Sequence, residues 1–521
     1  MTAARRGRGA AVLTRDGATV TDLSFAGLLQ NVEGLAERLC AHGVAAGGRV
    51  VVALPAGRDD LEARLGVLLA GAAIVPALPS EAEAVRDAVG ATHVLTAESL
   101  RALRSSEPGS RPRLAVPRPD DPAFVLRTSG DALRTVTIDH ATALRRAMAL
   151  APLGITADDV VLLVGPTPGL VVQSVGLYAL LCGATVAAAD GPWLDPTLVA
   201  DVQPTLIVCT PAAIERLHAE LVGEAERSGG LGKLALEWAV RIGCRATRAD
   251  DEGRPLPWLD KAQHFVATRV VGDELSRRLG GRVRSIVTGG ARLAEPVQRA
   301  LAGLGVEVLT TYGIAEAGGL THVSRPGRLR CGTVGAAIDG VRSGVDGDGA
   351  LVLWLDGPVT LGGEIQTGDL AAIDADGIVT LLGRRGHAIV VPPDRLVHPE
   401  ALESELRAQP LVQRALVHGA GRPFLSALIW LDEQQATAWA QAHDLPVEGL
   451  ARHPALFAEI GRVVERVNRT LRSFEVIAKF AIVETPIDPS NGDLSAAGDL
   501  RRGAVESSHR ALLDSFYTDR F

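Results

Sequence analysis

Residues 367–384 read TGDLAAIDADGIVTLLGR, in which two short apolar runs flank the polar stretch DADG at 374–377. Apolar runs on either side of a turn rich in Asp and Gly are typical of antiparallel strands joined by a tight connection. The run GALVLWLDG at 349–357 continues the pattern. We therefore expect a small region of short antiparallel strands that begins near residue 333.

Upstream of this region the chain alternates between strand-like and helix-like segments. The segment 28–44 is amphipathic and contains Gly43, a residue type that commonly ends helices. Alternation of this kind predicts βαβ units and parallel sheets, with ligands bound at the carboxyl ends of the strands. The strand-like runs are residues 49–54, 72–78, 159–165, 205–210, 284–290 and 306–313.

Downstream, the segment GRRGHAIVVPP at 383–393 leads into a smaller α+β region. We place a domain boundary and hinge at about residues 384–388. The predicted fold class is α/β, with residues 1–383 forming a large N-terminal domain. In that domain we expect mixed, largely parallel sheets flanked by helices, together with the small β subdomain. Residues 384–521 are predicted to form a smaller, mobile C-terminal α+β domain.

Composition excludes several classes of function. The chain has 521 residues, a net charge of −8 and no long basic run, which disfavours nucleic-acid binding. Its five cysteines show no CxxC spacing, as expected in a reducing compartment. No apolar run reaches the roughly 20 residues that span a bilayer, and no apolar segment follows the basic start. We therefore expect a cytoplasmic protein without an integral membrane segment or a signal peptide.

The stretch 367–384 resembles a signature of the acyl-adenylate-forming (ANL) superfamily, which includes acyl-CoA synthetases, luciferases and peptide-synthetase adenylation domains. Residues 471–484, LRSFEVIAKFAIVE, are similar to the end of a long-chain acyl-CoA synthetase. The resemblance covers nearly the whole chain. Further blocks stand in the family's order: VTGGARL at 287–293, LTTYGIAEAGG at 309–319, similar to the family's YGxTE block, and GTVGAAIDG at 332–340.

The resemblance implies two half-reactions. A carboxylate first attacks ATP to give an acyl-adenylate and pyrophosphate, and a thiol, usually that of coenzyme A, then displaces AMP. The resemblance also implies a bulky, apolar acid as the acyl group. The family's nucleotide-binding positions fall on Asp369, Arg384, Tyr312, Gly289, Gly290, Ala291 and Glu316.

Each of these positions has an implied role, and Asp369, Arg384 and Tyr312 also have a structural alternative. Asp369, expected at the end of a strand, can accept both hydroxyls of a ribose, but it could also cap a turn. Arg384 would contact ribose or phosphate, or else pair on the surface. Tyr312 would stack on adenine, or else pack in the core. Glu316 matches the family's magnesium carboxylate. The glycines 289–290 would let backbone approach the nucleotide closely.

The phosphate loop departs from the family. Such loops read TSGTTGxPKG and hold phosphates with backbone amides, hydroxyls and a lysine. Here Thr128, Ser129 and Gly130 remain, but the second threonine pair, the second glycine and the lysine are missing. Asp131 adds negative charge beside the expected triphosphate, which Arg134 partly offsets.

Three further positions also depart. Ala315 replaces the threonine of YGxTE. Asp499 stands where the family carries the adenylation lysine, and no lysine lies within 491–505. Loss of one electrostatic contact to developing charge typically costs a few kcal/mol. A cation from Arg501 or Arg502 is the alternative. His387 replaces the usual hinge Asp or Lys, which is compatible with reduced pivoting or with an inconsequential surface histidine.

The losses fall on triphosphate binding, whereas the retained positions would hold AMP. The residue pattern favours an enzyme that mainly performs thioesterification, transferring an acyl group from a preformed acyl-adenylate to coenzyme A. Such an enzyme implies a separate adenylating partner. Two alternatives stay open: a complete ATP-dependent acyl-CoA or acyl-carrier-protein ligase with a divergent loop, and a non-catalytic protein that binds acyl-adenylate or acyl-CoA.

Overall fold

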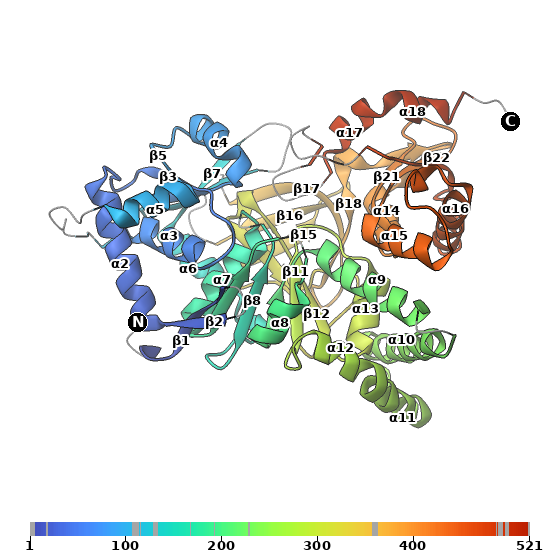
Figure 1. The fold of residues 1–521 in the computed structure, drawn as a ribbon. Coiled ribbons are helices and arrows are strands. Elements are labelled where there is room, and N and C mark those ends of the chain that lie inside the picture. The colour runs from blue at the N-terminus through green and yellow to red at the C-terminus, as the bar shows by residue number, and fades with distance from the viewer. Residues whose placement is uncertain are drawn as a thin grey trace.

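Figure 1 shows a large N-terminal domain and a smaller C-terminal domain of mixed α/β structure, as the sequence predicts. The structure is a computed structural model. It describes residues 6–16, 19–106, 114, 116–128, 134–166, 168–191, 193–227, 230–356, 363–485, 487, 493–494 and 500–518.

A nine-stranded sheet forms the centre of the large domain. Its six inner strands, β12 to β1, run parallel, and antiparallel pairs stand at both ends. In spatial order it consists of β14 (Ala336–Ala337), β13 (Gly319–Val323), β12 (Glu307–Ile314), β11 (Ser285–Gly289), β10 (Leu206–Val208), β8 (Val160–Val164), β9 (Thr185–Ala189), β1 (Ala10–Asp16) and β2 (Thr19–Ser24).

Both faces of this sheet are covered, which explains why its strands are continuous apolar runs. Leu163 and Val208 face α7 and α2, whereas Leu162 and Ile207 face α8, α9 and α13. The helices of this domain are α2 (Phe25–Ala41), α3 (Arg58–Leu69), α4 (Ala82–Val89), α5 (Ala97–Ser105), α6 (His140–Met148), α7 (Leu170–Cys182), α8 (Pro196–Val202), α9 (Pro211–Arg227), α10 (Gly230–Asp251), α11 (Trp258–Ala267), α12 (Asp273–Arg278) and α13 (Glu295–Gly303).

A second, five-stranded sheet packs between α2, α3 and α5 on one face and α4 on the other. Its β6 and β7 form an antiparallel hairpin at the sheet edge. In spatial order it consists of β5 (His93–Leu95), β3 (Arg49–Val52), β4 (Ala73–Pro76), β6 (Pro122–Arg127) and β7 (Thr135–Asp139).

The predicted small antiparallel region is a four-stranded sheet. The elements used below also include the short 3₁₀ helices η1 (Pro79–Glu81), η4 (Ala315–Ala317) and η5 (Arg385–His387), and the π-helical segment η3 (Thr268–Gly272). The sheet consists of β15 (Val341–Val345), β16 (Ala350–Leu355), β17 (Glu364–Ile373) and β18 (Val379–Arg384).

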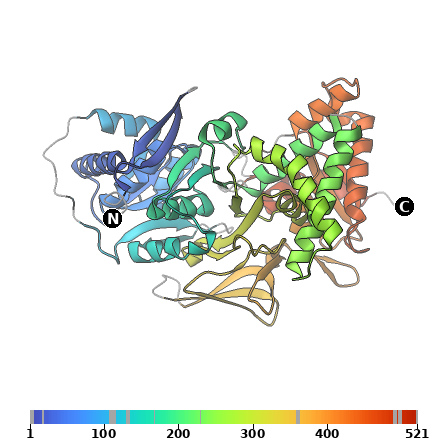
Figure 2. The ribbon, with the colours of Figure 1, turned by 90° about the horizontal axis from the view of Figure 1, so that it is seen from below.

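The C-terminal domain contains a three-stranded and a two-stranded sheet. Figure 2, seen from below, shows its helices next to α9 of the large domain. Its elements are β19 (Ile389–Val391), β20 (Arg395–Val397), α14 (Pro399–Arg407), β21 (Val412–His418), β22 (Leu425–Leu431), α15 (Glu433–Ala442), α16 (Pro454–Asn468), β23 (Ile477–Ile482), α17 (Arg502–Ser508) and α18 (Arg510–Ser515). The turn η5 lies where we predict the hinge, and the division of the chain at 384–388 stays a prediction.

All six predicted upstream strands are present, within a few residues of the expected bounds. The predicted amphipathic helix is α2, which begins three residues earlier than expected and ends at Ala41, with Gly43 at φ +91° just beyond it. The hairpin of β1 and β2 was not predicted. Among the described residues, no helix has the length and apolar character needed to cross a membrane.

Candidate nucleotide site

Strands from two sheets bring three of the predicted nucleotide residues together. Asp369 lies opposite Arg384 in the pairing of β17 with β18, and Tyr312 comes from β12 of the central sheet. The expectation that Asp369 ends a strand is wrong, because β17 continues to Ile373. Gly368 adopts φ +74° at a register shift of β17 against β16, which bulges the strand at this carboxylate instead of ending it.

Both oxygens of the Asp369 carboxylate are held. The Tyr312 hydroxyl donates to Oδ2 at 2.6 Å, and Nε of Arg384 lies 3.2 Å from Oδ1. Asp369 and Tyr312 are buried, whereas the Arg384 side chain is 46% exposed. Burial, together with the Asp369 charge, raises the pKa of Tyr312 above its ordinary range, so this hydroxyl remains a donor. We call these three residues the carboxylate cluster.

A buried histidine lies beside this cluster and was missed by the sequence analysis. His322 stands opposite Tyr312 in the pairing of β12 with β13, and the ring centroids are 5.8 Å apart. Its Nδ1 lies 3.0 Å from Oγ1 of Thr321, and its Nε2 has no hydrogen-bond partner in the described part of the chain. Burial lowers the pKa of His322 to about 4, so the imidazole is neutral at pH 7.

The neutral state of His322 predicts a loss of stability in acid. In the unfolded chain this imidazole takes up its proton near pH 6.5, and in the folded chain only near pH 4. The contribution of the neutral His322 to the free energy of unfolding is therefore complete above pH 6.5. It falls as the pH decreases toward 4, and about 2 kcal/mol of it is lost at pH 5. The free energy of unfolding, measured with urea, should decrease from pH 7 to pH 5 by about 2 kcal/mol more in the wild type than in His322→Leu.

The exposed His443 provides the control for this measurement, since His443→Leu should retain the acid loss of the wild type. An equal acid loss in the wild type and in His322→Leu would show that His322 is not the group responsible.

The turn after β11 exposes backbone near the same strands. A Cβ at Gly289 would overlap the hydroxyl and the carbonyl oxygen of Thr311, which is the partner of Gly289 on β12. Gly290 has φ +87° and open space around it, and Ala291 is exposed. Only glycine fits at the first position without displacing Thr311, as a close strand-to-turn passage requires.

The turn η4 follows β12 and carries two of the predicted positions. Glu316 is half-buried, and Ala315 is buried. Ala315 completes an apolar cluster whose other members belong to the β6–β7 hairpin: Leu126, Val136 and Ile138. The methyl group that replaces the family's threonine is thus packed against apolar side chains and offers no hydroxyl. Among the described residues, no group of three or more His, Cys, Asp or Glu side chains could hold a metal.

The predicted phosphate loop connects β6 to β7. The backbone N–H of Thr128 donates to the carbonyl oxygen of Arg134 at 2.9 Å, so the strand pairing extends to the start of the loop. At the end of β6, Arg127 forms an ion pair with Glu81 of η1, which neutralises its charge. Ser129, Gly130 and Asp131 lie outside the described residues.

At the predicted hinge, His387 is engaged and not free on the surface. Its Nδ1 lies 2.7 Å from Oε1 of Glu400 at the start of α14. Burial alone would raise the pKa of Glu400, but the hydrogen bond with His387 and the charge of Arg502 hold it below its usual value. His387 therefore connects η5 to the first helix of the C-terminal domain.

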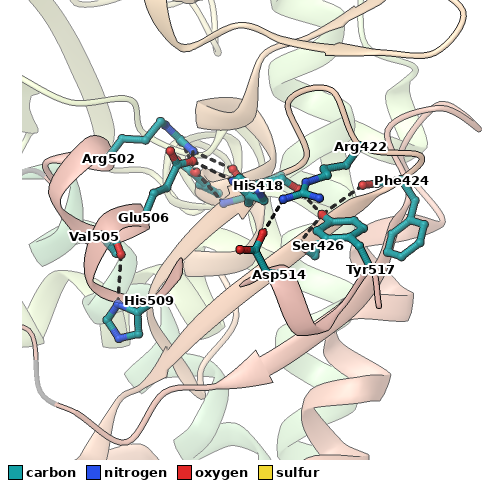
Figure 3. Close-up of polar contacts among 12 residues, drawn as sticks. His418, Arg422, Phe424, Ser426, Arg502, Val505, Glu506, His509, Asp514 and Tyr517 are labelled. Atoms are coloured by element: carbon teal, nitrogen blue, oxygen red, sulfur yellow. Dashed lines mark hydrogen bonds and ion pairs between the residues drawn. The ribbon is translucent and has the colours of Figure 1, made fainter. Parts of the chain in front are cut away.

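Arg502, one alternative to the missing lysine, is committed within the C-terminal domain. Its Nη1 donates to the carbonyl oxygen of Val417 at 2.6 Å, and its Nη2 pairs with Glu403. Glu506 approaches from α17 and contacts His418 at 3.0 Å (Figure 3). Burial lowers the pKa of Arg502, but the neighbouring glutamates raise it above its usual value, so the guanidinium stays charged and paired with them. This pairing disfavours a catalytic role for Arg502 in this arrangement. Asp499 lies outside the described residues.

Comparison with known proteins matches most of the chain to a single enzyme family. Residues 1–365 match the family model described as AMP-binding enzyme, and residues 388–520 match the model of the AMP-binding enzyme C-terminal domain. The long-chain-fatty-acid–CoA ligase FadD15 of Mycobacterium tuberculosis is 29% identical over 78% of this chain and 71% of its own length. The putative fatty-acid–CoA ligase fadD11 of the same species is 25% identical over 77% and 74%.

Solved structures share the fold at low sequence identity. The anthranilate CoA ligase AuaEII, in complex with anthranoyl-AMP, has a TM-score of 0.70 at 16% identity and covers 98% of this chain and 96% of its own. The o-succinylbenzoate CoA synthetase MenE of Bacillus subtilis, in complex with its acyl-adenylate intermediate, has a TM-score of 0.71 at 17% identity, with 97% and 96% covered. The chain belongs to the AMP-binding enzyme family of the ANL superfamily and is an acyl-CoA-synthetase-like member of it.

Proposed function

We propose that this chain forms thioesters from preformed acyl-adenylates, transferring the acyl group to coenzyme A with release of AMP. The observation that carries the proposal is a contrast between two parts of the site. The carboxylate cluster, which would hold the nucleoside, is complete. Ala315, where the family has a phosphate-binding threonine, is buried in an apolar cluster.

The chemistry of this step does not require a triphosphate site. The thiol sulfur bonds to the acyl carbonyl carbon, the bond from that carbon to the phosphate oxygen breaks, and AMP leaves with the electron pair. The thiol proton is released to solvent or to the phosphate. For this step the chain has to hold AMP as a leaving group, which we assign to Asp369, Arg384 and Tyr312.

The charges around the site disfavour the adenylation step. Adenylation places a triphosphate and a carboxylate together, so cations are needed near both. Arg127 is paired with Glu81 and Arg502 with Glu403, so neither charge is available in this arrangement. The sequence also has Asp499 where the family has a lysine.

The cofactors and partners follow from the same reasoning. Coenzyme A is the proposed thiol, because the relatives are named as CoA ligases. The name of FadD15 also favours a long-chain fatty acyl group, in keeping with the bulky, apolar acid expected from the sequence. Mg²⁺ would bind Glu316 together with phosphate oxygens, since it commonly combines one or two carboxylates with substrate phosphates. A separate adenylating enzyme would supply the labile acyl-adenylate.

The test uses a synthetic long-chain acyl-adenylate and coenzyme A, with AMP and acyl-CoA measured together. We expect stoichiometric formation of both products by the purified chain. A parallel reaction with ATP, Mg²⁺ and the free acid should form acyl-CoA at least about 1000-fold more slowly, as the loss of several transition-state contacts of a few kcal/mol each requires. Absence of acyl-CoA from the adenylate would favour a non-catalytic binding protein.

The complete ATP-dependent ligase is the second candidate. It is favoured by the names of the relatives, which are ligases, and by MenE of Bacillus subtilis, which has been solved in complex with ATP and a magnesium ion. Comparable rates of acyl-CoA formation from ATP plus acid and from the acyl-adenylate would support this candidate over thioesterification alone.

A further inference from the structure

The helical segment from α10 to α12 of the large domain carries an exposed apolar face. The face is formed by α11 and η3, and Trp258 at its start is 80% exposed, with Phe265 and Val270 both 62% exposed. Figure 1 shows α11 at the lower edge of the molecule, away from both domains' sheets, and Figure 2 shows the neighbouring helices from that side. We call this set the α11 face: Trp258, Leu259, Phe265, Val266 and Val270.

The opposite side of α11 is firmly packed, so the exposed side chains do not result from a loose helix. Ala267 is fully buried, and Nε2 of His264 lies 2.9 Å from the carbonyl oxygen of Gly303 in α13. Beneath it, α10 and α13 approach so closely that a Cβ at Gly243 would overlap the backbone of Gly303. The packed helices α10 and α13 therefore give the α11 face a rigid support.

The charges on this face have one sign. Lys261 and Arg269 are exposed on α11 and η3, and the Arg269 guanidinium lies 5.3 Å from the centre of the Phe265 ring. The acid of the same stretch, Asp260, is 22% exposed, and its Oδ1 lies 3.7 Å from Nη1 of Arg245 in α10. Apolar and aromatic side chains flanked by exposed cations thus stand out on a chain whose net charge is −8.

We propose that the α11 face binds the surface of an anionic phospholipid membrane. Trp and Phe side chains favour the boundary between headgroups and acyl chains, and Lys and Arg extend from that depth to lipid phosphates. Anionic lipids attract such cations. A second copy of this chain fits the face less well, because two cationic faces would meet. The binding is peripheral and does not depend on which half-reaction the chain performs.

The experiment measures sedimentation of the full-length chain with vesicles of phosphatidylcholine mixed with phosphatidylglycerol, and with vesicles of phosphatidylcholine alone. We expect at least about tenfold tighter binding to the anionic vesicles. Phe265→Gln/Val270→Gln should bind at least about tenfold more weakly. Phe457→Gln/Val447→Gln should bind like the parent chain, because those side chains are 48% and 46% exposed in the C-terminal domain.

A second pair of variants tests the charges. Lys261→Glu/Arg269→Glu should abolish the preference for phosphatidylglycerol, whereas Arg462→Glu/Arg466→Glu, which changes two exposed arginines of α16, should keep it. The proposal is overturned if the parent chain does not bind anionic vesicles, or if Phe265→Gln/Val270→Gln binds them as tightly as the parent. Self-association through the α11 face without vesicle binding would also overturn it.

Discussion

Asp369→Asn is expected to lower kcat/KM for acyl-CoA formation from a synthetic acyl-adenylate by about 100-fold. The substitution removes the charge that the Tyr312 hydroxyl and Arg384 both contact. It also replaces one carboxylate oxygen, a ribose acceptor, with an amide NH2 group that can only donate. Two hydrogen bonds from the ribose hydroxyls to the charged carboxylate together contribute about 3 kcal/mol, which corresponds to the expected 100-fold decrease in kcat/KM. Steady-state kinetics with the acyl-adenylate as the varied substrate measure the effect.

The matched control lies in the turn of the same pair of strands. Asp374 follows β17 and accepts from the backbone N–H groups of Asp376 and Ile378, so Asp374→Asn alters the turn without touching the carboxylate cluster. Its kcat/KM should stay within about twofold of the wild type. If Asp369→Asn also stayed within that range, Asp369 would not be the nucleotide ligand that we propose.

Arg407→Leu is expected to release the C-terminal domain from the large domain. Arg407 of α14 lies 3.2 Å from Oε2 of Glu215 in α9, and it donates to the carbonyl oxygen of Arg292 at 3.3 Å. Burial raises the pKa of Glu215, and Arg407 opposes that rise. Removing one partner of a buried ion pair typically costs about 3 kcal/mol or more, so amide exchange at the α9–α14 contact should accelerate about 100-fold.

Glu215→Leu/Arg407→Leu separates loss of the ion pair from burial of an unpaired Glu215 charge. Two apolar side chains replace the ion pair without leaving a buried charge, so hydrogen exchange should return close to that of the wild type. Arg452→Leu removes a largely exposed partner of Glu484 and should leave the exchange at α9 and α14 unchanged. Equal exchange in Arg407→Leu and the wild type would exclude this contact as the attachment between the domains.

The sequence was most informative where local pattern determines structure. The six upstream strands were predicted because both faces of their sheets are buried, which makes them continuous apolar runs. β1 and β2 were missed because their segment alternates only weakly. Their position depends on the pairing of Val12 with Val186, a contact distant in sequence that no local pattern encodes.

The residues of the candidate site likewise fall into those that a motif predicts and those that only tertiary contacts place. Asp369, Arg384 and Tyr312 were found through ordered motifs, and their contacts agree with a shared site. His322 was missed because a single histidine in an apolar strand has no motif. Only the pairing of β12 with β13 places it beside Tyr312. The engagement of Arg502 with Glu403 was likewise hidden, because the two residues are 99 positions apart.

Exchange of labelled pyrophosphate into ATP, with a panel of long-chain acids, most directly tests whether adenylation has been lost. It should be run on a preparation that forms acyl-CoA from a synthetic acyl-adenylate, so that the protein is known to be active. We predict no exchange above the rate without enzyme for any acid in the panel. Robust exchange that depends on the acid would contradict a thioesterification-only enzyme and identify a complete ligase.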